Sequence, residues 1–237
     1  MPSDPSDHDD MTREFWGEDL SGALFRDVDL TGATITHAWL VDVQIDALVD
    51  RLVVNGVDVT AYVNERDPWY PLRAMLRPTT PADMAATWAM LDAEWNAAIE
   101  AVQTLSEADA HAKVNDEFSF VQTLRHLVFA DDKWFTSPVL GEPLHPSGLP
   151  NTGSLDFPFP GLDLGLSTTL ADAVAVFDDR RQKVRHFLAT LAADDLERPI
   201  DVMENGEHPL RECIFTLFEE SFWHLRYARR DLDILTA

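Results

Sequence analysis

Two histidines and a glutamate are the residues of this sequence best suited to bind a metal ion. Glu220 and His224 stand four positions apart in residues 219–224 (EESFWH), so a helix would place both side chains on one face. His126 stands among apolar residues of another helical segment. A third ligand from a facing helix would complete a three-ligand site with coordination positions open for water or substrate. Spacing alone does not separate this site from a core histidine with a polar neighbour, so both interpretations stay open.

Three further side chains could bind a cofactor or substrate beside these ligands. His145 lies in a Pro- and Gly-rich stretch that could reach over the site. Arg226 and Arg229 flank Glu220 and His224 in sequence and could attract the carboxylate of a thiol or substrate. Pairing of these arginines with the nearby Asp231 or Asp233 is the plainer explanation.

The remaining candidates have structural interpretations that are at least as good. Asp132 and Glu219 could orient a ligand imidazole, or could simply be solvated. Cys213 is expected to be a buried, inert thiol. No residue is assigned a catalytic role. The other histidines, expected to be exposed or incidentally packed, are His8, His37, His111, His186 and His208.

Four helices are expected to position these residues. The first begins at Thr80, a good N-cap, with Pro81 in its first turn. Residues 136–167 are rich in Pro and Gly and predict a long loop between the second and third helices. The predicted helices cover about 80–102, 118–135, 167–191 and 209–235. Four helices with one long crossover are typical of a bundle.

Residues 80–237 resemble the DinB/YfiT-like superfamily of four-helix metal-binding proteins. The resemblance lies in residues 117–127 (EFSFVQTLRHL) and 220–228 (ESFWHLRYA). Many members place one ligand histidine on the second helix and a His-x-x-x-His pair on the fourth. Here Glu220 stands where the first histidine of that pair would be. This substitution is similar to the branch of mycothiol-dependent maleylpyruvate isomerase, whose metal is held by two histidines and a glutamate.

Carried over to this sequence, the resemblance implies that His126, Glu220 and His224 bind a divalent metal. Zn²⁺ is expected, and Ni²⁺ or Fe²⁺ would also suit these ligands. The implied function is a metal-dependent enzyme that uses a low-molecular-weight, mycothiol-like thiol for S-transfer or isomerisation of an electrophilic small molecule. Two alternatives stay open: a stress-related interaction protein with a non-catalytic metal site, and a metal-dependent hydrolase.

Residues 15–45 follow a different pattern, with a large apolar residue at every fifth position. Such a period fits neither a helix nor a flat strand, and it resembles pentapeptide-repeat proteins, whose right-handed β-helix takes four such sides per coil. An amphipathic strand pair with chance spacing is the alternative. We expect the large apolar residues of this ladder to be buried. They are Phe15, Leu20, Phe25, Leu30, Ile35, Leu40 and Ile45.

The predicted fold class is therefore mainly α with a small β part. The expected segments are a disordered tail at 1–10, a pentapeptide-repeat-like β segment at 11–60, a connector at 61–79 and the bundle at 80–237. Asn55-Gly56 predicts a type I′ hairpin at the end of the β segment. Fewer than two coils bury little area, so we expect residues 11–60 to pack against the bundle and unfold with it.

Composition restricts the classes of partner. The 237 residues include 18 Lys plus Arg against 42 Asp plus Glu, a formal net charge of -24. This charge disfavours nucleic acid and anionic membranes, and no apolar run approaches the roughly 20 residues of a membrane span. A single cysteine excludes an internal disulfide framework. We expect a cytoplasmic protein with a small-molecule substrate, and a homodimer stays an open alternative to a monomer.

Overall fold

The computed structural model describes residues 13–25, 28–151 and 157–236. The chain divides into two compact units between Ala47 and Leu48, and each is described by itself. The predicted tail at 1–10 lies outside the described residues.

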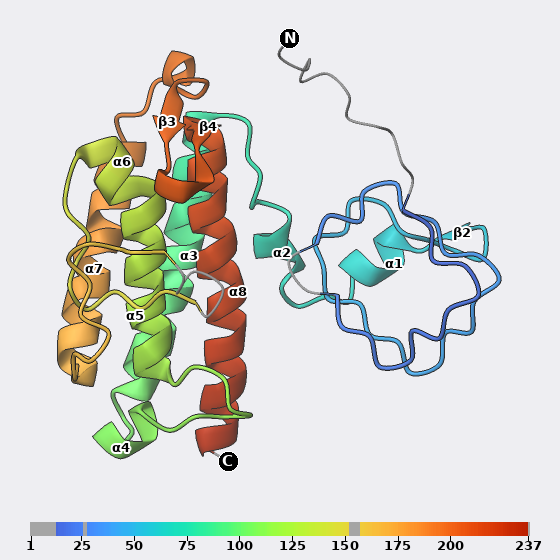
Figure 1. The fold of residues 1–237 in the computed structure, drawn as a ribbon, viewed down its shortest axis with the longest axis horizontal. Helices are drawn as coiled ribbons and strands as arrows, with labels where there is room; N and C mark the ends of the chain where they lie inside the picture. The colour runs from blue at the N-terminus through green and yellow to red at the C-terminus, as the bar shows by residue number, and fades with distance from the viewer. Residues whose placement is uncertain (1–12, 26–27, 152–156, 237) are drawn as a thin grey trace, which may run out of the picture. The chain divides into compact units, whose positions relative to one another are not determined.

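Among the described residues of the first unit, the backbone turns are spaced by multiples of five positions. The amides of Ala23 and Ala33 donate to the carbonyls of Leu20 and Leu30 at 3.0 Å, and each bond closes a tight turn. Figure 1 shows this segment as a wide coil in blue. The residues with left-handed backbone, at φ between 53° and 76°, are Gly17, Gly22, Gly32, His37 and Asp42. The five-residue period of the sequence is therefore also a period of the backbone.

The predicted burial of the apolar ladder is wrong. Its members, from Phe15 to Ile45, are 43% to 69% exposed. With fewer than two coils, each ladder residue has few stacked neighbours to cover it. The described residues between 13 and 47 contain no β-strand, so a β-solenoid is not shown.

The second unit opens with the predicted hairpin. Strand β1 (Val53–Val54) pairs antiparallel with β2 (Val57–Asp58). Asn55 and Gly56 have φ of 50° and 82°, the left-handed conformation that a type I′ turn needs at both positions. This short turn is confirmed as the sequence predicts it.

The connector holds two short helices and packs on the bundle. Helices α1 (Thr60–Asn64) and α2 (Tyr70–Arg73) follow the hairpin. Leu72 and Leu76 are buried in the same hydrophobic core as the long helices. Residues 70–76 are therefore part of the folded body of the second unit.

Four long helices lie side by side, as Figure 1 shows, and form the bundle that the sequence predicts. Helix α3 packs against α7 and α8, and α5 packs against the same two helices. The largest fully buried side chains between them include Trp95, Phe177, Phe218 and Phe222. The long helices are α3 (Pro81–Val102), α5 (Phe120–Asp131), α7 (Leu170–Leu188) and α8 (Leu210–Thr236).

Side-chain caps set the starts of three of these helices. Thr80, Ser119 and Thr169 each accept a hydrogen bond from a backbone amide three residues later. Ser119 forms a full capping box with Gln122, whose side chain accepts from the Ser119 amide. The second and third helices therefore start two to three residues later than 118 and 167.

The second predicted helix runs past 135, but it is not α-helical throughout. After α5 the chain forms a π-helical turn, η1 (Asp132–Thr136), and a short helix, α6 (Ser137–Leu140). Pro138 has no amide hydrogen to donate, so the α-helical ladder cannot continue regularly through this segment. The Thr136 hydroxyl donates to the Asp132 carboxylate within the turn.

Short elements complete the second unit. They are α4 (Glu107–Ala110), η3 (Ala193–Asp195), β3 (Pro199–Asp201), η4 (Met203–Asn205) and β4 (Glu207–Pro209). Strands β3 and β4 pair antiparallel just before α8, as Figure 1 shows, in a hairpin that the sequence did not predict. Gly206, with φ of 77°, permits the chain reversal between them.

Asp132 joins three parts of the bundle. Its carboxylate is fully buried and accepts from Arg180 of α7, with Nε at 2.7 Å. The same carboxylate accepts from the backbone amide of His145, in the long loop, at 2.6 Å. A buried carboxylate needs such partners, because an uncompensated charge in the core is costly.

Arg180→Ala should therefore strongly destabilise the chain. Removing one partner of a buried ion pair costs about 3–5 kcal/mol, because the other charge stays buried. The free energy of unfolding in denaturant measures this loss. The matched control is Arg185→Ala, because Arg185 is half-exposed and its partner Asp92 keeps a second arginine, Arg181. The control should lose at most about 1 kcal/mol. Equal losses would contradict the role of Asp132.

Candidate metal centre

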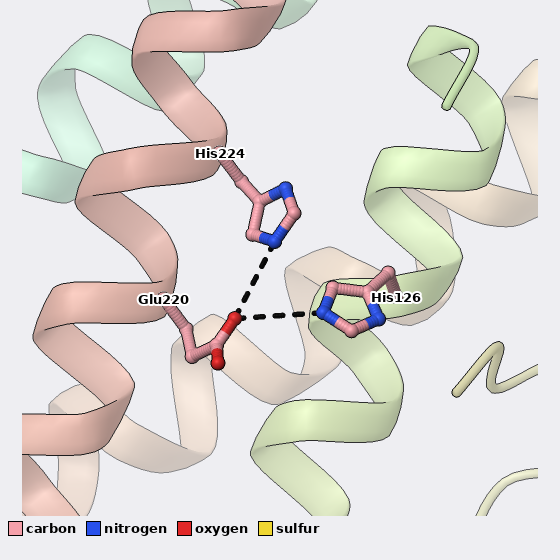
Figure 2. A group of neighbouring side chains, drawn as sticks. All are labelled: His126, Glu220 and His224. Carbon is pink, nitrogen blue, oxygen red and sulfur yellow. Dashed lines mark ion pairs between the residues drawn. The ribbon is translucent and has the colours of Figure 1, made fainter. Parts of the chain in front are cut away.

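Three potential ligand side chains converge between α5 and α8. Figure 2 shows His126 of α5 facing Glu220 and His224 of α8. One Glu220 oxygen, Oε2, lies 3.5 Å from Nε2 of His126 and 3.4 Å from Nε2 of His224. The three ligand atoms all lie within 4.8 Å of one another. The structure thus brings together the three residues that the sequence selects.

The ring of His126 is fixed by a backbone partner. Its Nδ1 lies 2.9 Å from the carbonyl oxygen of Leu149. A carbonyl only accepts, so Nδ1 carries the proton in this bond. The lone pair of a neutral ring is then on Nε2, which faces Glu220. Such a partner orients a metal-binding imidazole and selects its tautomer.

The group is more open on the α8 side than on the α5 side. The side chain of His126 is 5% exposed, whereas those of His224 and Glu220 are 19% and 34% exposed. Aromatic rings flank the imidazoles, with Phe118 at 5.4 Å from His126 and Tyr227 at 6.2 Å from His224 between ring centroids. Solvent therefore reaches the group mainly at Glu220 and His224.

Glu220 is held in its charged form. Burial raises the pKa of this carboxyl, but hydrogen bonds that His126 and His224 donate when their Nε2 atoms are protonated outweigh burial and hold the pKa well below its usual range. An ionised carboxylate is an acceptor only and attracts cations. The donor set, two imidazole nitrogens and a carboxylate oxygen, fits a divalent transition metal and leaves coordination positions for other ligands.

The structure brings none of the three predicted cofactor-binding residues into this group. The His145 ring lies 2.7 Å from the hydroxyl of Ser147. Arg229 pairs with Glu94 at 2.8 Å and not with the expected aspartates. Arg226 stacks over Trp223, with its guanidinium carbon 5.2 Å from the ring centroid. Their cofactor-binding role stays a prediction.

The predicted orienting carboxylates have other partners. Asp132 binds Arg180 of α7, and Glu219 pairs with Arg77 at 2.8 Å. The group that orients His126 is instead the Leu149 carbonyl. Sequence reasoning missed it because every residue carries a carbonyl, so no residue type marks the one that is used.

Cys213 is not among the ligands. It is fully buried, and burial raises the pKa of its thiol to about 11. A thiol with this pKa is mostly protonated at neutral pH, so little of the reactive thiolate is present. The prediction of a buried, inert thiol agrees with this environment.

A cavity of about 420 Å³ lies elsewhere in the second unit. Leu144, Phe159 and Glu204 are among its lining residues, and none of the three ligand side chains lines it. Its walls are mostly apolar, and Glu204 is already paired with Lys133 at 2.5 Å. We place the candidate site at the converging ligands because the donor atoms for chemistry lie there.

Four long helices with two histidines and a glutamate converging between two of them define a helical-bundle protein with a candidate metal centre. The family model of the DinB superfamily matches residues 90–228, more than half of the chain. The chain therefore belongs to the DinB superfamily. No curated protein and no solved structure matches it. In the described ranges, no helix combines the length and the apolar character needed to cross a membrane.

Metal content should depend on the three converging residues and not on other histidines. His126→Ala, Glu220→Ala and His224→Ala should each sharply reduce the metal bound per chain, because each removes one of three ligands. Elemental analysis after purification without chelator measures this. His111→Ala and His186→Ala are controls, since neither residue is in the group. Equal metal content in all five variants would refute the site.

Acid should remove the stability that Glu220 gives to the metal-free chain. Because the pKa of Glu220 is lower in the folded chain than the ordinary value of 4.5, its ionised form stabilises the fold above that pH. The contribution is lost as the pH falls below 4.5 toward the folded pKa. The difference in unfolding free energy between the wild type and Glu220→Gln should therefore shrink from neutral to acidic pH. A difference that stays constant or grows would contradict this assignment.

Proposed function

We propose that this chain is a metal-dependent enzyme that uses a low-molecular-weight, mycothiol-like thiol for S-transfer or isomerisation of an electrophilic small molecule. The observation that carries the proposal is the donor set: two imidazoles and one ionised glutamate, reached from the α8 side. Membership of the DinB superfamily is compatible with a metal-dependent function. The thiol rests on Glu220 standing in place of a third histidine, as in the mycothiol-dependent branch.

Each ligand has a distinct part in this proposal. A bound divalent cation, with Zn²⁺ expected and Ni²⁺ or Fe²⁺ also suited, would lower the pKa of a coordinated thiol. His126 supplies a ligand atom whose direction the Leu149 carbonyl fixes. Glu220 balances part of the positive charge, and its partial exposure leaves room beside it for a substrate. Phe118 packs beside the ring of His126 and Tyr227 beside the ring of His224, so each imidazole has an aromatic neighbour.

The first unit supports a second candidate function, an interaction role. Trp16 and Trp39 are 84% and 94% exposed, together with the apolar ladder. Large exposed apolar surfaces are typical of protein–protein contacts. This role would add to the metal site, since the two functions use different units of the chain.

Cobalt spectroscopy on the full chain tests the thiol directly. Co²⁺ bound at the three ligands should give visible absorption that changes saturably on addition of mycothiol or N-acetylcysteine, because a thiolate enters its coordination sphere. N-acetylserine, which has a hydroxyl in place of the thiol, is the matched control and should cause no such change. A spectrum that no thiol alters would exclude thiol-dependent chemistry and favour a hydrolase, with water as the fourth ligand.

A further inference from the structure

We propose that Arg125 is a positioning residue that holds residues 145–149 of the long loop against α5, so that the Leu149 carbonyl fixes the ring of His126. The inference rests on the proposed metal site, because its importance lies in aiming Nε2 of His126. Arg125 itself would not bind the metal and would act on His126 only through the loop.

Three hydrogen bonds join the loop to two consecutive residues of α5. The Arg125 Nε donates to the carbonyl of Ser147 at 2.8 Å. The Leu149 amide donates back to the Arg125 carbonyl at 3.0 Å. The Leu149 carbonyl then accepts from Nδ1 of His126 at 2.9 Å. The arginine and the ligand histidine are therefore coupled through the same loop backbone.

The loop has little freedom to shift at this place. A Cβ on Gly148 would lie 3.1 Å from Leu162 Cδ2 and 3.3 Å from Phe129 Cβ, so the backbone approaches α5 as closely as a glycine permits. The buried Asp132 carboxylate accepts from the amide of His145 at 2.6 Å and holds the start of the loop. The Arg125 bond to Ser147 lies between these fixed points and the carbonyl of Leu149.

Burying the charged side chain of Arg125 costs more free energy than burying an apolar side chain of similar size. Arg125 is 8% exposed, and among the described residues its Nη2 is buried without a hydrogen-bond partner. Burial lowers its pKa, and Asp163 opposes this effect electrostatically without an ion-pair contact. An apolar chain such as Met would fill the space without burying a charge. An apolar side chain could not donate a hydrogen bond to the buried Ser147 carbonyl, whereas Arg125 does, and this hydrogen bond orders the loop.

The test uses Arg125→Met in the full chain. On metal-free, ¹⁵N-histidine-labelled protein at pH 8, long-range ¹H–¹⁵N correlation reports which His126 nitrogen carries the proton. The wild type should show the Nδ1–H form alone, whereas the variant should show a mixture, because the loop carbonyl is no longer held. The affinity for Zn²⁺, measured by competition with a chromogenic chelator, should fall about 10- to 100-fold. Arg211→Met, at an exposed pair with Glu197, is the control and should change neither readout.

Two further variants keep the proposal testable if Arg125→Met does not fold. Arg125→Lys retains a donor and should preserve the Nδ1–H form. Gly148→Ala keeps the arginine but crowds the loop against Leu162 and Phe129, and a tautomer mixture in this variant would support the role of the loop backbone. A single Nδ1–H form in Arg125→Met, or a mixture in Arg125→Lys, would overturn the proposal, even if Zn²⁺ affinity fell. A wild type with the Nδ1–H form that binds no Zn²⁺ would instead overturn the metal site and leave the positioning role standing.

Discussion

The buried ion pair between Asp132 and Arg180 is the interaction on which the site depends. Both side chains lie inside the bundle, where an unpaired charge would be costly. The carboxylate also binds the His145 amide, so the pair that joins η1 to α7 fixes the start of the long loop as well. That loop then places the Leu149 carbonyl on His126. The ion pair that stabilises the bundle and the candidate ligand His126 are thus connected through the same loop.

The two helices contribute to the centre in different ways. Helix α8 carries Glu220 and His224 one turn apart, so regular helical geometry alone aims both at the same point. Helix α5 carries a single candidate ligand, His126, and helical geometry alone does not select the tautomer of its ring. The loop supplies the hydrogen-bond partner that selects it. This difference explains why a site between helices needs a segment of irregular backbone beside it.

The sequence could predict what has a local signal. Spacing of four places Glu220 and His224 on one face, and the resemblance adds His126. The N-cap Thr80 marks the start of the first long helix. The π-turn at 132–136, the Arg229–Glu94 pair and the Leu149 carbonyl could not be predicted, because their partners are distant in sequence or are backbone groups. For the apolar ladder of residues 15–45, the sequence predicted the spacing correctly but not the burial. The described backbone turns are spaced by multiples of five residues, but so short a segment leaves the large apolar side chains exposed.

The central claim is that His126, Glu220 and His224 form one metal site, and X-ray absorption at the zinc edge of the loaded full chain tests it most directly. The account predicts scattering from two imidazoles with oxygen in the remaining positions and no sulfur, because Cys213 is buried and protonated. Addition of a small thiol should then introduce one sulfur at about 2.3 Å. Sulfur ligation before any thiol is added, or an absence of imidazole scattering, would contradict the account.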